Sequence, residues 1–233
     1  DVLIRLDAPF RNSGAGTFDL ATYKINLAIV EALIKRSDVP IEAVDEHRWG
    51  VDLDKNGTLG RATKVRYDWA PKQGRTMSFV GQAAQEQAAG RVHLAAGLYP
   101  EGTEFLHSVR YLDVTQAGAI ALAPRMKELR YAKKRSWLSY LELQMAAGDE
   151  LKEKYDYPDR LSTFIGDVEQ GLSNGQGWVY AGFIEDSRGN LRPQSYEETT
   201  SCMGCHSGLG VTTDGTFAFP RKKEAREFQE GWY

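Results

Sequence analysis

The sequence has few cysteines and no long apolar run. Only two of its 233 residues are cysteine, and these lie close together, at Cys202 and Cys205. Disulfide-stabilised domains need more cysteines and wider loops, so that class of protein is excluded. Because no run of 18 or more apolar residues occurs, we expect a protein that does not span a membrane. Repeats of fixed period and low-complexity tracts are also missing.

A surplus of one charge is missing as well. The chain has 29 basic and 32 acidic side chains, which give a net charge of −3. This balance gives no reason to expect nucleic acid or an anionic membrane as a partner. Hydrophobic residues make up 42% of the sequence and charged residues 26%, as in ordinary globular proteins. The length allows one large domain or two small ones with a real core.

The sequence begins with Asp1, and no basic and apolar signal region follows it. We expect either that a signal peptide has been removed or that the sequence starts inside a longer protein. The first interpretation predicts a periplasmic or otherwise exported protein.

The spacing of apolar residues predicts an α+β fold, with a mostly antiparallel sheet and flanking helices. Helices are expected from Asp19 to about Asp38, over 82–96, over 135–155 and around 202–206. Strands or hairpins are expected over 103–112, 178–184 and 212–220.

The strongest chemical signal is Cys202-Met203-Gly204-Cys205-His206, the C-x-x-C-H pattern of c-type haem attachment. Two thiols three positions apart on a helical turn reach the two vinyl groups of one porphyrin. His206 then binds the iron from the proximal side. The motif therefore predicts one covalently bound haem c.

Other interpretations fit the motif less well. A thioredoxin-type redox pair would follow a strand in a βαβ unit, whereas Cys202 follows a turn-rich stretch. A zinc site would need two more ligands, and His47, His93 and His107 form no compact spacing with the cysteines. A chance match to so short a pattern is the third alternative.

The sixth iron ligand is left open between histidine, methionine and an open position. His107 shares the apolar face of its expected strand with Phe105 and Val109, which makes it the candidate distal ligand. A histidine on such a face is nevertheless more often a core residue. His93 and His47 are weaker candidates. Three further methionines are expected to fill the core: Met77, Met126 and Met145.

Two other polar patterns have two interpretations each. The segment 52–57 matches the start of a calcium loop, but Thr63 stands where the last, glutamate ligand belongs. A hairpin turn at Asn56-Gly57 with solvated acids is the favoured interpretation. The basic run 133–135 is expected to be a solvated face, or a docking patch for an acidic redox partner.

Two stretches of the second half resemble the cytochrome P-460 and cytochrome c′-β family. The segment 97–105 looks like that family's aromatic-Pro-acid-Gly-Thr turn, and it runs into the strand at Val109-Arg110. Residues 177–183, the haem motif and Thr216-Phe217 resemble its penultimate strand, haem site and closing strand. The resemblance implies a P-460-like haem domain at 81–233 behind a helical and turn-rich extension at 1–80, or one continuous domain.

The resemblance also implies an open distal haem face and, in some members, a lysine crosslinked to the porphyrin that supports hydroxylamine oxidation. The segment 118–122 stands where this lysine is expected and contains none, and Lys127 is the nearest. We therefore expect an exported monohaem cytochrome that exchanges electrons with a redox partner protein. The alternative is an open-site haem protein, an oxidoreductase of the P-460 type, that binds or oxidises a small gaseous or nitrogenous ligand. A structural haem in an assembly protein ranks third.

Overall fold

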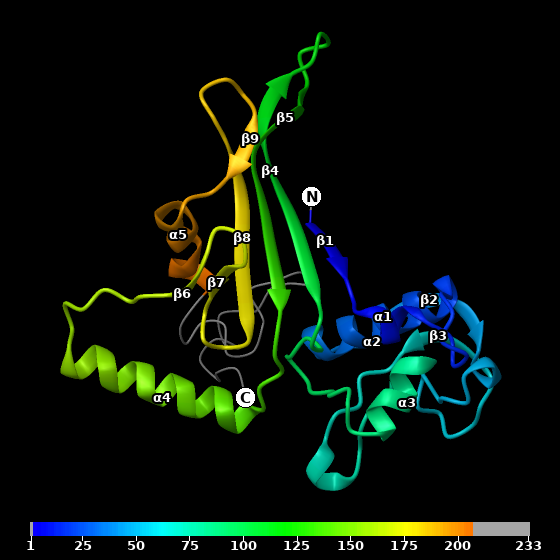
Figure 1. The fold of residues 1–233 in the computed structure, drawn as a ribbon. Helices are drawn as coiled ribbons and strands as arrows, with labels where there is room; N and C mark the ends of the chain where they lie inside the picture. Colours follow the sequence, from blue (N-terminus) through cyan, green and yellow to red (C-terminus); the bar gives the residue numbers. More distant parts are fainter. Residues whose placement is uncertain (1, 207–233) are drawn as a thin grey trace. The chain divides into compact units, whose positions relative to one another are not determined.

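The structure is a computed structural model that describes residues 2–206, with side chains as far as Met203. The chain forms two compact units (Figure 1). The helical unit contains residues 6–101, and the sheet unit contains residues 2–5 together with 102–206. The sequence-based division after residue 80 falls inside the helical unit, because residues 81–101 belong to that unit's core through contacts that are distant in sequence.

The helical unit is built from short elements around one long helix, α2 (Leu20–Lys35). Helix α1 (Ala8–Arg11) precedes it, and an antiparallel pair of strands, β2 (Val39–Asp45) and β3 (Arg61–Val65), follows it. The unit also contains the 3-10 helices η1 (Glu46–Arg48) and η2 (Pro71–Gln73), and helix α3 (Gln82–Ala88).

Helix α2 begins and ends where its sequence provides caps. The Asp19 carboxylate accepts a hydrogen bond from the backbone N–H of Thr22, as expected for a helix that starts here. At the other end Arg36 adopts a left-handed conformation, and its N–H donates to a carbonyl of the last turn. Between the caps the helix buries apolar side chains such as Ile29 and Leu33. The predicted helix from Asp19 is therefore confirmed.

A buried asparagine joins three segments of the helical unit. Asn26 on α2 is fully buried, and its amide donates to the carbonyls of Phe10 and Val80 at 2.9 and 3.1 Å. Its side-chain oxygen accepts the Val80 N–H at 2.9 Å. The neighbouring Phe79 ring packs edge to face on Phe10, with 4.8 Å between the ring centroids. Satisfied polar groups at this depth favour one arrangement of α1, α2 and the segment that leads to α3.

Helix α3 is shorter than expected, since it ends at Ala88 rather than near residue 96. Gly90 has a φ of 71°, and its N–H closes the helix on the carbonyl of Gln87. The chain then returns to α2, where the Gly97 N–H donates to the Leu33 carbonyl at 3.0 Å. Alanine and glutamine favour a helix locally, but tertiary packing overrides this propensity.

The sheet unit is an antiparallel sheet accompanied by two helices (Figure 1). The order of its described strands is β1-β4-β5-β8-β7-β6, and β9 also pairs with β8. The strands are β1 (Val2–Arg5), β4 (Glu104–Val114), β5 (Ile120–Lys134), β6 (Ile165–Asp167), β7 (Gly171–Ser173), β8 (Trp178–Glu185) and β9 (Leu191–Pro193). The helices are α4 (Tyr140–Asp156) and α5 (Tyr196–His206). The expected α+β class with an antiparallel sheet is confirmed.

Strand pairing gathers bulky side chains on one buried face of the sheet. Phe105 pairs with Ala132, which pairs with Tyr180, and paired residues share a face. Trp178 lies two residues before Tyr180, is fully buried and has its ring centroid 5.8 Å from that of Phe105. Lys134 pairs with Trp178, and its Nζ lies 5.6 Å from the centre of the indole ring. We call these five residues the buried face.

Strands β4 and β8 agree with the predicted strands, whereas β5 was not predicted and α4 starts later than expected. Helix α4 begins at Tyr140 rather than at residue 135, because Ser139 and Glu142 form a capping box. The Ser139 N–H donates to the Glu142 carboxylate at 2.7 Å, and the Glu142 N–H donates to the Ser139 hydroxyl at 3.3 Å. The expected strand over 212–220 lies outside the described residues.

Replacing Asn26 by leucine should lower the free energy of unfolding by about 3 kcal/mol. The volume is similar, but three buried backbone groups lose their partners, and each such group costs roughly 1–3 kcal/mol. Urea unfolding followed by circular dichroism measures the loss. Lys24→Ala on the same helix, where the side chain is exposed, is the control and should change stability by less than about 0.5 kcal/mol. Equal effects of the two substitutions would contradict the role of Asn26.

Candidate functional site

The C-x-x-C-H motif lies at the end of helix α5, as the sequence predicts. Cys202 and Cys205 are three residues apart on this helix, so they lie on the same side of it. Cys202 is half-buried, and His206 is the last helical residue. The side chains of residues 204–206 are outside the described part, so iron ligation by His206 stays a prediction.

Polar contacts fix the start of helix α5. The Ser195 N–H donates to the Glu198 carboxylate at 2.8 Å, and the Glu198 N–H donates back to the Ser195 hydroxyl at 3.3 Å. Arg192 binds the same carboxylate through both terminal nitrogens, at 2.7 and 2.8 Å. The Arg192 guanidinium first, and the Ser195 N–H second, lower the pKa of Glu198 to about 2. The cap therefore stays ionised over the physiological pH range.

One side of helix α5 is buried. Thr199 and Met203, one turn apart, have exposed fractions of 5% and 0%. The helix contacts strands β7 and β8 (Figure 1). The Tyr196 hydroxyl donates to the Phe164 carbonyl at 3.1 Å and accepts the N–H of the same residue at 3.2 Å. The haem motif is therefore carried by a capped and packed helix.

His107, the candidate distal ligand, lies on β4. It pairs with Arg130 of β5, which pairs with Gly182 of β8, so it points to the same side of the sheet as the buried face. It lies two strands from β8 and is exposed to solvent. Burial of part of the ring, and then the Arg130 charge, lower the pKa of His107. The imidazole is therefore neutral at pH 7, the form that binds metals, and its role as a ligand stays a prediction.

The weaker iron-ligand candidates are placed elsewhere. The Nδ1 of His47 lies 2.8 Å from the Asp45 carboxylate, and His93 is exposed. Met77 fills the core of the helical unit as expected, with 2% exposure. Met145 on α4 is 61% exposed, so its expected core role is wrong. The reason is that Leu143 is the buried residue of this helix.

The basic run 133–135 is not a solvated face throughout. Lys134 belongs to the buried face, and Lys133 forms an ion pair with Glu104 at 3.2 Å. The Tyr131 hydroxyl donates to the same carboxylate at 2.8 Å. Burial first, and Glu104 second, raise the pKa of Tyr131 to about 12. Burial alone would raise the pKa of Glu104, but bonds from Tyr131, Arg5 and Lys133 outweigh it and lower the pKa.

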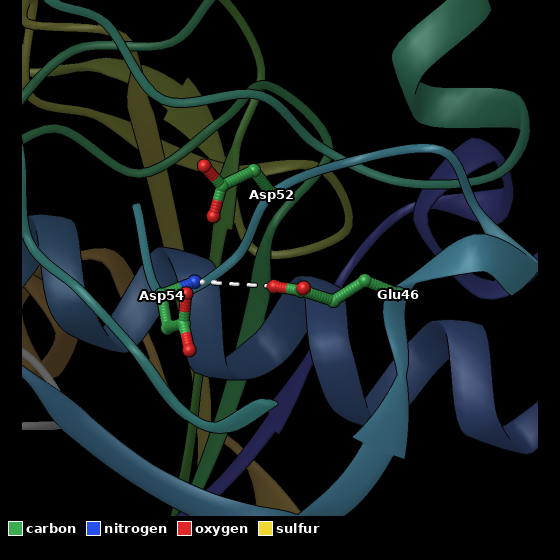
Figure 2. Close-up of side chains that lie close together, drawn as sticks. All are labelled: Glu46, Asp52 and Asp54. Carbon is green, nitrogen blue, oxygen red and sulfur yellow. Dashed lines mark hydrogen bonds between the residues drawn. The ribbon is translucent and has the colours of Figure 1, made fainter. Parts of the chain in front are cut away.

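A second group of candidate ligands lies in the helical unit. Carboxylate oxygens of Glu46, Asp52 and Asp54 lie within 4.8 Å of one another (Figure 2). Oxygen ligands of this kind are those that Ca²⁺ takes in proteins. The two aspartates belong to the predicted calcium-loop pattern, whereas Glu46, which precedes the loop and is fully buried, was not predicted. The sequence feature that could have indicated Glu46 is a charged residue directly after strand β2, next to the turn-rich segment.

Hydrogen bonds to carboxylates organise this loop, so the predicted Asn56-Gly57 hairpin turn is wrong. Strands β2 and β3 are instead joined by the whole of 46–60. The Glu46 carboxylate accepts the backbone N–H groups of Leu53 at 2.6 Å and Gly60 at 2.9 Å. A weaker bond of 3.3 Å comes from the N–H of Asp54 (Figure 2). These bonds already satisfy the Glu46 carboxylate, so the acidic group by itself establishes no metal site.

Fold and motif together describe an α+β protein with a C-x-x-C-H pattern on a packed helix. Its family follows from comparisons with known proteins. A family model described as ":-like lipoprotein" matches residues 1–233. A protein of Aquifex aeolicus (strain VF5) described as an uncharacterized lipoprotein is 34% identical over 229 residues, which are 98% of this chain and 33% of that relative. The chain belongs to this lipoprotein family.

Family membership indicates an exported protein, as the sequence predicts. The chain spans about a third of the length of the relative. No solved structure matches the chain. Within residues 2–206, no helix is long and apolar enough to cross a membrane.

The comparisons contradict the resemblance to the cytochrome P-460 and cytochrome c′-β family. The lipoprotein family matches the whole chain, including the first eighty residues that the resemblance left out. Apart from the C-x-x-C-H motif and residues 216–217, which lie outside the described part, the stretches that carried the resemblance are a turn closed by Gly102, with a φ of 79°, and the two strands β4 and β8. Turns and alternating strands of this kind have general physical requirements and occur in unrelated sheets.

Glu46→Gln should destabilise the helical unit by about 2 kcal/mol. One carboxylate oxygen becomes an amide NH₂, which cannot accept a hydrogen bond, so a buried N–H group loses its partner. Thermal unfolding measures the loss. Glu42→Gln on β2 is the matched control, since its side chain is 88% exposed, and it should change stability by less than about 0.5 kcal/mol. A Glu46 variant as stable as the parent would show that these bonds contribute no stability.

Proposed function

We propose that this protein is an exported c-type cytochrome with one haem, held covalently by Cys202 and Cys205 and with His206 as the proximal iron ligand. The observation that carries the proposal is the position of the C-x-x-C-H motif at the end of a capped and packed helix. When bound, the haem supplies one-electron redox chemistry at its iron.

The residues around the motif suit a covalently bound haem. Cys202 and Cys205 share one side of α5, and Met203 is turned away from that side into the protein. The buried side of α5 contacts strands β7 and β8, so packing of the helix on the sheet leaves the side with the cysteines for the porphyrin.

Electron exchange with a redox partner protein is the function that we propose for this haem. Covalent attachment keeps a haem on the protein even when its edge is accessible to a partner. The lipoprotein family supports an exported, periplasmic location, and a lipid anchor would hold the protein at a membrane surface. Oxidation of small nitrogen compounds rested on the family resemblance that the comparisons contradict, so we do not propose it.

The haem should stay with the polypeptide after denaturation and acid-acetone extraction, because thioether bonds survive conditions that remove a merely ligated haem. The intact mass of protein made with a working cytochrome maturation system should exceed that of the bare chain by one haem. A mass equal to the bare chain would contradict the proposal. His206→Ala should abolish the native absorption spectrum, whereas His47→Ala, the matched control in the helical unit, should leave it unchanged.

The prediction that His107 is the sixth iron ligand has a spectroscopic test. The ferric parent should be low-spin, and its ferrous form should bind carbon monoxide slowly, because the gas must displace an imidazole. His107→Ala should give a high-spin ferric spectrum and rapid binding of carbon monoxide. Rapid binding that is the same in parent and variant would rule out His107 as a ligand and indicate an open iron site.

A further inference from the structure

The hairpin of β4 and β5 extends beyond the rest of the sheet (Figure 1). Strand β1 pairs with β4 only from Glu104 to His107, and β8 pairs with β5 only from Glu128 to Lys134. Among the described residues, the ribbon from Arg110 to Lys127 therefore pairs only with itself. We call this ribbon the arm. A two-stranded ribbon is marginally stable in water on its own, so its exposed surface calls for an explanation.

The end of the arm presents four aliphatic side chains on one face. Leu112 pairs with Leu122 and Val114 pairs with Ile120, and paired residues point to the same side. The exposed fractions of these four side chains are 73, 59, 65 and 75% in that order. No charged residue occurs from Val114 to Pro124. A single exposed aliphatic side chain is ordinary, but a contiguous set at the end of a ribbon marks a contact surface.

Behind this tip the arm is basic. It contains three basic side chains and one acidic side chain, Asp113, which give +2, whereas the whole chain has −3. Lys127 is exposed. The Arg125 guanidinium lies 5.0 Å from the centre of the Tyr111 ring and forms an ion pair with Glu185 of β8. An apolar tip followed by aromatic and basic side chains is complementary to a lipid interface with anionic headgroups.

We propose that the tip of the arm, residues 112–122, docks on an anionic lipid surface. The aliphatic rows cover two residue steps, about 7 Å at roughly 3.3 Å per residue, and interfacial segments enter a bilayer by about 5–10 Å. A two-stranded ribbon cannot go deeper, because its unpaired edge groups need water. Membership of a lipoprotein family supports a membrane as the nearby partner. The proposal is independent of the haem.

Co-sedimentation of the 233-residue chain with vesicles tests the proposal. The parent should bind vesicles of phosphatidylcholine and phosphatidylglycerol in equal parts, and it should bind pure phosphatidylcholine more weakly. Leu112→Ser combined with Ile120→Ser should weaken binding about tenfold, because two aliphatic side chains no longer leave water. The matched control is Leu141→Ser combined with Leu151→Ser on α4, where both leucines are exposed. The control should bind like the parent.

A second variant avoids any dependence on how the serines affect the arm. Ile120→Trp should show a blue-shifted difference emission on addition of anionic vesicles, because the indole enters an apolar layer. A parent that does not bind vesicles, or equal weakening by the two double variants, would overturn the proposal. It would also be overturned if the parent self-associates without vesicles and the tip variant stays monomeric, since the tip would then bind a second copy of the chain.

Discussion

The register of strand β8 is the constraint on which the sheet unit depends. Its alternation puts Trp178, fully buried, against Phe105 of β4 and under Lys134 of β5, so one side chain joins three strands. A shift by one residue would turn Trp178 and Tyr180 to the opposite face. The same strand pairs with β7 and contacts α5. Strand β8 therefore takes part both in the sheet and in the packing of the helix that carries the C-x-x-C-H motif.

Elements with local signals could be predicted from the sequence. Helix α2 has its cap at Asp19, β4 and β8 are rich in aromatic and β-branched residues, and α5 carries the C-x-x-C-H motif. Strand β5 was missed, because Pro124 and the many charged side chains after it hide the alternation. Its strand conformation depends on pairing with β4 and β8 on both sides, which is a tertiary effect. The prediction made helix α3 too long for the opposite reason. The alanine and glutamine residues favour a helix locally, but the chain turns at Gly90, which has a positive φ.

The candidate site shows the same limit. The cysteine spacing and the histidine lie within five consecutive positions, so the C-x-x-C-H pattern could be recognised without a structure, and haem attachment stays a proposal. Glu46 could not be assigned in this way, because folding brings its carboxylate to the N–H groups of Leu53 and Gly60. The mistaken family resemblance rested on short turn and strand patterns, which many sheets share. The lipoprotein family match has more weight because it extends over the whole chain.

The net charge is a sum over the whole chain, whereas a partner contacts only one part of the surface. A total of −3 predicts no attraction to an anionic membrane, although the arm alone has +2 and no charged residue occurs from Val114 to Pro124. At physiological salt the Debye length is about 8 Å, so a partner responds to the groups near its contact rather than to the sum. A composition can exclude a partner only where the charges are spread evenly. Seeing the uneven spread here requires knowing that residues 110–127 form one ribbon, and β5, the strand hidden in the sequence, is half of that ribbon.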